Sequence, residues 1–120
     1  MKVQVAAYTV PTEAPESDGT AEWDSTTLVV AELAHKDVRG LGYTYADAAT
    51  ARAVQFLAPS VEDLSPFDTR LIFEMAVKAL RNHGRGGASA MAISALDCAA
   101  WDLKARLLGV PLARLLGTAP

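Results

Sequence analysis

Acidic side chains near the C-terminal end are the first candidates for chemistry, because carboxylates bind divalent cations and transfer protons. Asp97 and Asp102 lie five positions apart in a stretch with helical periodicity. Five helical positions correspond to a rotation of about 140°, so these two carboxylates cannot grip one ion. Asp102 and Arg106 have the i, i+4 spacing of a surface ion pair. Apolar neighbours around Asp97 predict a buried carboxylate that accepts hydrogen bonds.

The histidines and the cysteine have no partners with metal-site spacing. His35 and His83 are far apart and lack a nearby Cys or His, so we expect neither to bind a metal. Cys98 is the only cysteine, which rules out an internal disulfide and suits a cytoplasmic location. We expect a buried, inert thiol, since a reactive one would need a cationic neighbour. The glycine-rich segment 84–87 matches no phosphate-loop spacing, so a flexible turn is favoured over an anion-binding nest.

The polar stretch from Pro11 to Ser25 (PTEAPESDGTAEWDS) is a further candidate. It contains two prolines, several carboxylates, a Ser-Asp-Gly turn signal and the large side chain of Trp23. Connections longer than about 12 residues are uncommon unless they are functional or disordered. We therefore expect a loop, disordered in the isolated chain, in which Trp23 has no strand partner. A functional loop and a passive connection both remain open.

Three β-strands are predicted in the first part of the chain. They cover Val3 to Val10, where Pro11 ends the strand, then Thr26 to Ala34, and finally Val38 to Tyr45. The last two should form an antiparallel hairpin around Lys36-Asp37. Two glycines, Gly40 and Gly42, fall on one face of the third strand, which predicts a close backbone neighbour or a bulge.

Helical periodicity follows Tyr45. One helix should start at the cap Asp47 and end near Leu57, because Pro59 interrupts the pattern. A second should start at Asp68 and carry His83 in its last turn. A third runs from Ala88 to Leu108 and is apolar on so many sides that it should be covered on more than one. A short helix with Leu112, Leu115 and Leu116 comes last. Strands followed by helices indicate one α+β domain of 120 residues.

Composition excludes several classes of partner. The net charge is −3 and no basic cluster is present, so nucleic-acid binding is not expected. No apolar run reaches the roughly 18 residues of a membrane span. The N-terminus enters a strand pattern at once, without the features of a signal peptide.

The segment Ala92-Ile93-Ser94-Ala95-Leu96-Asp97-Cys98-Ala99-Ala100-Trp101-Asp102 carries a family resemblance. With Gly109-Val110-Pro111-Leu112 and Leu115-Leu116-Gly117, it resembles the end of the N-terminal domain of mandelate racemase/muconate lactonizing enzymes, in the enolase superfamily. The hairpin ending in Gly40-Leu41-Gly42-Tyr43 is also similar to that domain. The resemblance implies an enolase N-terminal domain-like α+β fold over residues 1–120. In it, a three-stranded antiparallel meander precedes a bundle of three to four helices.

The resemblance also implies a divided enzyme, an isomerase or lyase. The capping domain closes over a barrel of about 250 residues that this chain lacks. The barrel binds Mg²⁺ and supplies the bases that remove a proton α to the carboxylate of a substrate such as an acid sugar. The Lys-x-Lys pair common in family barrels does not occur among Lys2, Lys36, Lys78 and Lys104. We therefore expect no catalytic residue, no metal ligand and no activity from this chain by itself.

Two capping loops are implied as specificity elements. The first corresponds to Pro11–Ser25, whose candidate residues are Glu16, Ser17, Asp18, Gly19, Thr20 and Trp23. The second follows the third strand, where Tyr43 and Tyr45 could contact substrate or simply pack at the sheet edge. Asp97, Trp101 and Asp102 are expected at the junction with the barrel.

The expected partners are the C-terminal barrel, a small carboxylate substrate and further copies in a homo-oligomer, which we expect to form through the C-terminal helices. The rival hypothesis is a stand-alone protein-interaction module without a catalytic partner.

Overall fold

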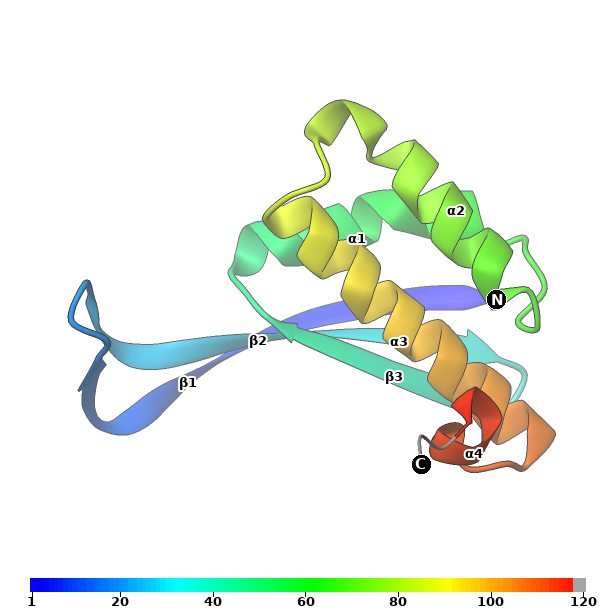
Figure 1. Cartoon of the computed structure of the whole chain (residues 1–120), viewed down its shortest axis with the longest axis horizontal. Helices are drawn as coiled ribbons and strands as arrows, with labels where there is room; N and C mark the ends of the chain where they lie inside the picture. The colour runs from blue at the N-terminus through cyan, green and yellow to red at the C-terminus, as the bar shows by residue number, and fades with distance from the viewer. Residues whose placement is uncertain (118–120) are drawn as a thin grey trace.

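The computed structural model describes residues 1–117 and shows one sheet with helices on one face (Figure 1). The elements in chain order are β1 (Lys2–Ser17), β2 (Glu22–His35), β3 (Val38–Tyr45), α1 (Ala48–Val61), α2 (Thr69–Ala79), the 3₁₀ turn η1 (Arg81–His83), α3 (Ala88–Leu108) and α4 (Leu112–Leu116). The sheet is antiparallel with the order β1-β2-β3. The predicted α+β meander followed by helices is confirmed.

The core lies between the sheet and three helices. Alternate residues of β2, namely Val29, Ala31 and Leu33, are fully buried against the helices. Each helix contributes fully buried aliphatic side chains to the same cluster, among them Leu57, Ile72, Leu96 and Leu103. The opposite face of the sheet carries the exposed side chains of Tyr8, Val10, Leu41, Tyr43 and Tyr45. One sheet face is therefore the core and the other is open.

Helix α3 lies directly on the backbone of β3. A Cβ atom at Gly40 would overlap the backbone of Ala99 and Leu103, and one at Gly42 would overlap the carbonyl oxygen of Ala95. Any side chain larger than hydrogen would push the helix away from the strand. Of the two predicted alternatives, a close backbone neighbour is therefore correct.

The prediction of a loop from Pro11 to Ser25, between the first two strands, was wrong. Both strands continue past the predicted limits and pair from Lys2↔Ala34 to Ser17↔Glu22. Pro11 does not end β1, because no hydrogen bond to β2 needs an N–H at that position. The N–H of Val3 donates to Glu62 and so points away from β2. N–H groups alternate in direction along a strand, so the nitrogen of Pro11 also points away from β2, and its missing N–H costs no ladder bond.

The predicted end of the first helix was also wrong, since α1 includes Pro59 and continues to Val61. Proline removes one helical hydrogen bond, but Leu57 and Val61 are fully buried on either side of it. The hydroxyl of Ser60 also donates to the carbonyl oxygen of Leu57 at 2.6 Å. Burial of the last turn outweighs the local penalty. The predicted second helix ends at Ala79, so His83 lies in η1 instead.

Candidate functional site

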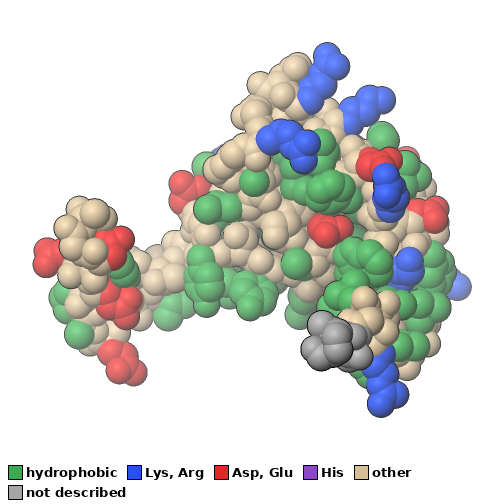
Figure 2. All heavy atoms as spheres, viewed as in Figure 1, with side chains coloured by type: hydrophobic (Ala, Val, Ile, Leu, Met, Phe, Trp, Pro, Cys, Tyr) green, Lys and Arg blue, Asp and Glu red, His purple; other side chains and the backbone are tan. Residues whose placement is uncertain are grey.

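The first two strands extend beyond the third as a two-stranded arm. β3 ends at Tyr45, opposite Leu28, whereas β1 and β2 continue to Ser17 and Glu22 (Figure 1). Segment 11–25 contains five carboxylates, Glu13, Glu16, Asp18, Glu22 and Asp24, and neither Lys nor Arg. Figure 2 shows acidic side chains gathered on this arm, which stands apart from the body of the domain. The arm is therefore an acidic projection of the sheet.

Asp18 organises the tip of the arm. Its Oδ1 atom accepts hydrogen bonds from the hydroxyl of Thr20 at 2.6 Å and from the backbone N–H groups of Thr20 and Ala21 at 2.9 and 3.1 Å. The Thr20 hydroxyl, followed by these backbone donors, lowers the pKa of Asp18 to about 2. Gly19 takes a φ of 87°, a conformation that favours glycine. The tip is thus a defined turn.

The arm carries an irregularity near its base. Between Pro11↔Ser25 and Glu16↔Trp23, β1 advances by five residues and β2 by two. Beyond this bulge, Trp23 pairs with Glu16, and its Nε1–H donates to the Glu16 carboxylate at 2.9 Å. Our expectation that Trp23 lacks a strand partner was therefore wrong. Bulges bend strands, so this one sets the direction of the arm.

The end of β3 and the base of the arm share a hollow of about 500 Å³. The lining residues are Val10, Pro11, Thr12, Thr26, Leu28 and Tyr45. The ring of Tyr43 meets that of Tyr45 edge to face, with 6.3 Å between centroids. Both tyrosine side chains are exposed, by 62% and 65%. The structure thus brings Tyr43 and Tyr45 to the arm base, whereas segment 18–20 lies at the far tip (Figure 1).

Thr12 is a member of this hollow that sequence reasoning missed. Its hydroxyl oxygen is out of contact with water and has no hydrogen-bond partner among the described residues. Uncompensated burial of a hydroxyl is unfavourable, so this group is available for a donor or acceptor that reaches the arm base. Tyr8, Val10 and Thr12 are alternate residues of β1, and this period of two could have predicted that Thr12 lies on the same face as Tyr8. The prediction that Pro11 ends the strand prevented that reading.

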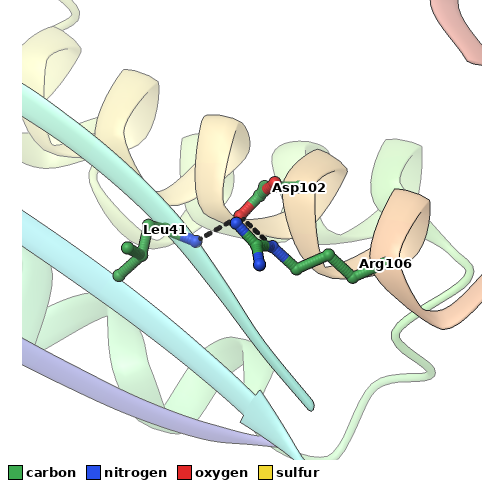
Figure 3. A network of polar contacts seen from close by, with 3 residues as sticks. All are labelled: Leu41, Asp102 and Arg106. Atoms are coloured by element: carbon green, nitrogen blue, oxygen red, sulfur yellow. Dashed lines mark hydrogen bonds and ion pairs between the residues drawn. The ribbon is translucent and has the colours of Figure 1, made fainter. Parts of the chain in front are cut away.

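Asp102 links α3 to the free edge of β3. Its Oδ2 atom accepts hydrogen bonds from the backbone N–H of Leu41 at 2.9 Å and from Nε of Arg106 at 2.8 Å (Figure 3). The predicted pair of Asp102 with Arg106 is confirmed. The bond to Leu41 was not predicted, because it joins positions 61 residues apart.

The outer face of α3, defined here by Met91, Asp97, Cys98 and Trp101, lacks cover in this chain. Asp97 is half-buried rather than buried, and none of the hydrogen bonds found within residues 1–117 reaches its carboxylate. Desolvation raises the pKa of Asp97. Cys98 is exposed, so the predicted buried thiol was wrong: its position on the helix points away from the core. Trp101 is half-exposed, with Nζ of Lys104 5.1 Å from its ring centroid.

Residues 1–117 do not form a metal centre of their own. Within residues 1–117, no three His, Cys, Asp or Glu side chains come close enough to hold a metal ion. The residues described here therefore do not fit a Mg²⁺ site. No helix in this part of the chain is long and apolar enough to cross a membrane.

Comparisons with known proteins agree on one domain type. Residues 1–117 match the model of the mandelate racemase/muconate lactonizing enzyme N-terminal domain. L-talarate/galactarate dehydratase from Salmonella typhimurium is 34% identical over 95 residues, which cover 75% of this chain and 24% of that enzyme. The chain thus spans about a quarter of the length of this curated relative.

Solved structures show the same relationship. A mandelate racemase/muconate lactonizing enzyme-like protein from Rubrobacter xylanophilus superimposes with a TM-score of 0.91 and 49% identity over 95% of this chain and 32% of that one. A racemase from Streptomyces coelicolor with bound magnesium has a TM-score of 0.91 and 31% identity over 97% of this chain and 34% of that one. L-talarate/galactarate dehydratase with Mg and L-lyxarohydroxamate has a TM-score of 0.79 and 27% identity over 98% of this chain and 33% of that one. The chain belongs to the mandelate racemase/muconate lactonizing enzyme family, in which it corresponds to the N-terminal domain.

Proposed function

We propose that this chain is the capping and substrate-specificity domain of a Mg²⁺-dependent enolase-superfamily enzyme. Such an enzyme removes a proton α to a carboxylate and acts as a racemase, epimerase, dehydratase or cycloisomerase. The relatives that support the proposal are an L-talarate/galactarate dehydratase and a racemase with bound magnesium. An acid sugar is accordingly the substrate class to test first.

One observation carries the capping role. The projecting arm and the end of β3 converge on the hollow that contains Thr12 and Tyr45. Two chain segments that meet at one end of a sheet can cover a site on a neighbouring domain from two sides. In this proposal Tyr43, Tyr45 and Trp23 contact substrate, and Thr12 gains a hydrogen-bond partner there. Segment 16–20 forms the distal part of the cover.

The division of labour follows from the side chains present. Since residues 1–117 do not gather a metal ligand set, Mg²⁺ belongs to the C-terminal barrel in this proposal. The bound ion there supplies electrostatic stabilisation of negative charge that develops on the substrate. This chain contributes orientation of the substrate and exclusion of water.

The outer face of α3 is the proposed junction with the barrel. Trp101 and Cys98 are apolar side chains left partly or wholly uncovered, which suits docking. Asp97 lies between them and has no hydrogen-bond partner among residues 1–117, so in this proposal the barrel offers it a donor or a cation. Asp102 reaches the same junction from the side of β3.

The experiment uses the whole enzyme that contains this domain, supplied with Mg²⁺ and a panel of acid sugars. Turnover and incorporation of solvent deuterium at the α carbon are measured. Trp23→Ala should lower kcat/KM about tenfold while the Tm stays nearly unchanged, because Trp23 lies on the arm and not in the core. Phe56→Ala, which removes an exposed aromatic side chain from α1, is the matched control and should leave kcat/KM unchanged.

Two results would count against the proposal. Absence of α-proton exchange with every acid tested would favour the stand-alone interaction module. A fall in Tm of several degrees for Trp23→Ala with unaltered kinetics would make Trp23 a structural residue. The 120-residue chain by itself should show neither turnover nor micromolar Mg²⁺ binding.

A further inference from the structure

The hollow at the base of the arm is lined by uncharged residues. Three of them carry hydroxyl groups and three are apolar: Thr12, Thr26 and Tyr45, and Val10, Pro11 and Leu28. A hydroxyl group can both donate to and accept from another hydroxyl, but it cannot neutralise a full negative charge. The lining therefore suits an uncharged, hydroxyl-bearing group better than a carboxylate.

The two segments that meet at the hollow carry negative charge without a balancing cation. Segment 11–25 has five carboxylates, segment 43–47 adds Asp47, and neither segment contains Lys or Arg. None of the ion pairs found within residues 1–117 includes a carboxylate of either segment. Arg52, the first cation after these segments, belongs to α1 on the other face of the sheet (Figure 1). The electrostatic potential at the arm base is therefore negative.

This potential distinguishes between two kinds of acid sugar. In the proposed function, the barrel binds the carboxylate next to the α proton, so the opposite end of the substrate reaches the capping domain. A monoacid presents a neutral hydroxymethyl group at that end, whereas a diacid presents a second carboxylate. Like charges repel, and salt screens them little within the Debye length of about 8 Å at physiological ionic strength. A second carboxylate at the arm base is therefore unfavourable.

We infer that the arm and its hollow select acid sugars with a single carboxylate, whose neutral, hydroxylated end occupies the hollow, and that they disfavour diacids. This inference rests on the proposed function and deepens it by naming the substrate class. Specific sites commonly combine attraction of the right ligand with repulsion of the wrong one. Thr12, whose hydroxyl has no hydrogen-bond partner within residues 1–117, is the residue that we assign to the terminal hydroxyl group of the substrate.

The test uses the whole enzyme that contains this domain, with Mg²⁺ and pairs of aldonate and aldarate such as galactonate and galactarate. The members of a pair share their stereocentres and differ only in the terminal group, which is hydroxymethyl in one and carboxylate in the other. We expect kcat/KM to be about tenfold higher for the aldonate than for the aldarate. Because both members present the same carboxylate to the barrel, their ratio reports on the terminal group.

A pair of double variants assigns this ratio to the arm. Glu13→Gln with Asp24→Asn neutralises two carboxylates that lie within two residues of the hollow-lining Thr12 and Thr26. At low ionic strength it should raise kcat/KM for the aldarate about threefold and leave that for the aldonate nearly unchanged, and high salt should abolish this gain. The control, Asp63→Asn with Glu74→Gln, removes the same charge from exposed positions outside the arm and should leave the ratio as in the wild type.

Thr12→Val tests whether the hydroxylated end occupies the hollow. The substitution preserves the size of the side chain and removes its hydroxyl, so kcat/KM for the aldonate should fall about tenfold. For the terminal deoxy analogue, which has a methyl group in place of hydroxymethyl, kcat/KM should stay nearly the same. Thr44→Val is the matched control, because Thr44 alternates with Gly42 on the face of β3 that meets α3 and not on the face of the hollow.

The possible failures separate the inference from the proposed function. A wild-type preference for the aldarate, a ratio that the arm variant leaves unchanged, or equal losses for the aldonate and its deoxy analogue in Thr12→Val would overturn the inference, while α-proton exchange would still support the proposed function. Absence of exchange with every aldonate and aldarate would overturn the proposed function and this inference with it.

Discussion

The backbone N–H of Leu41 donates to the carboxylate of Asp102 at 2.9 Å and thereby connects the free edge of β3 to α3. The same carboxylate atom also binds Arg106. One acidic side chain therefore satisfies a strand edge and completes a helical ion pair. Because this carboxylate is only 22% exposed, its loss should be felt more than that of an ordinary surface charge.

Asp102→Ala should lower the free energy of unfolding by about 1–2 kcal/mol, since it leaves the N–H of Leu41 without its acceptor. Urea denaturation measures this change. Glu74→Ala is the matched control, because Glu74 forms an exposed i, i+4 pair with Arg70 worth only a few tenths of a kcal/mol. Equal effects of the two variants would show that the bond to Leu41 contributes nothing measurable.

Gly42→Ala should destabilise the fold by about 3 kcal/mol, because its methyl group would overlap the backbone of α3 at Ala95. Thermal unfolding followed by circular dichroism measures the loss. Gly86→Ala is the control: no atom lies within 4 Å of a Cβ at that position. A wild-type Tm for Gly42→Ala would mean that the helix can move away from the strand at little cost.

The pH dependence of stability should contain a contribution from Asp97. Desolvation raises its pKa in the folded state, so the folded protein binds a proton more tightly than the unfolded chain. Between the unfolded value of 3.8 and the higher folded value, stability should therefore fall as pH rises. Asp97→Asn should remove this slope in urea denaturation. The control Asp63→Asn, which removes one exposed carboxylate, should retain this slope. An unchanged slope in Asp97→Asn would contradict its attribution to Asp97.

Asp18 should titrate with a pKa of about 2 in an NMR pH series. The depressed value means that the turn is favoured above the unfolded pKa of 3.8 and loses this support as pH falls through about 2. Thr20→Ala removes the hydroxyl that is the largest cause and should raise the pKa of Asp18 toward 3.8. Ser17→Ala, which removes a neighbouring hydroxyl, should leave the lowered pKa of Asp18 unchanged. A normal pKa in the wild type would mean that the tip is not held by these bonds.

Local pattern was enough for the order of elements, and at Gly40 and Gly42 it left two alternatives, a close backbone neighbour or a bulge. The β-branched runs and the capping side chain of Asp47 act within a few residues of each position, whereas Asp68 precedes α2 without a side-chain capping bond. The spacing of Asp102 and Arg106 likewise needs only helical geometry. These features depend on short-range sterics and hydrogen bonding, which the sequence by itself determines.

The tertiary structure decided the rest. Pro11 was read as a strand end because the sequence does not state which strand edge its nitrogen faces. Pro59 was read as a helix end because burial of Leu57 and Val61 is a long-range effect. The hollow at Thr12 and Tyr45 and the bond from Leu41 to Asp102 each depend on register or on contacts between distant segments. Such contacts form only when the whole sheet and its helices are in place, and no local preference encodes them.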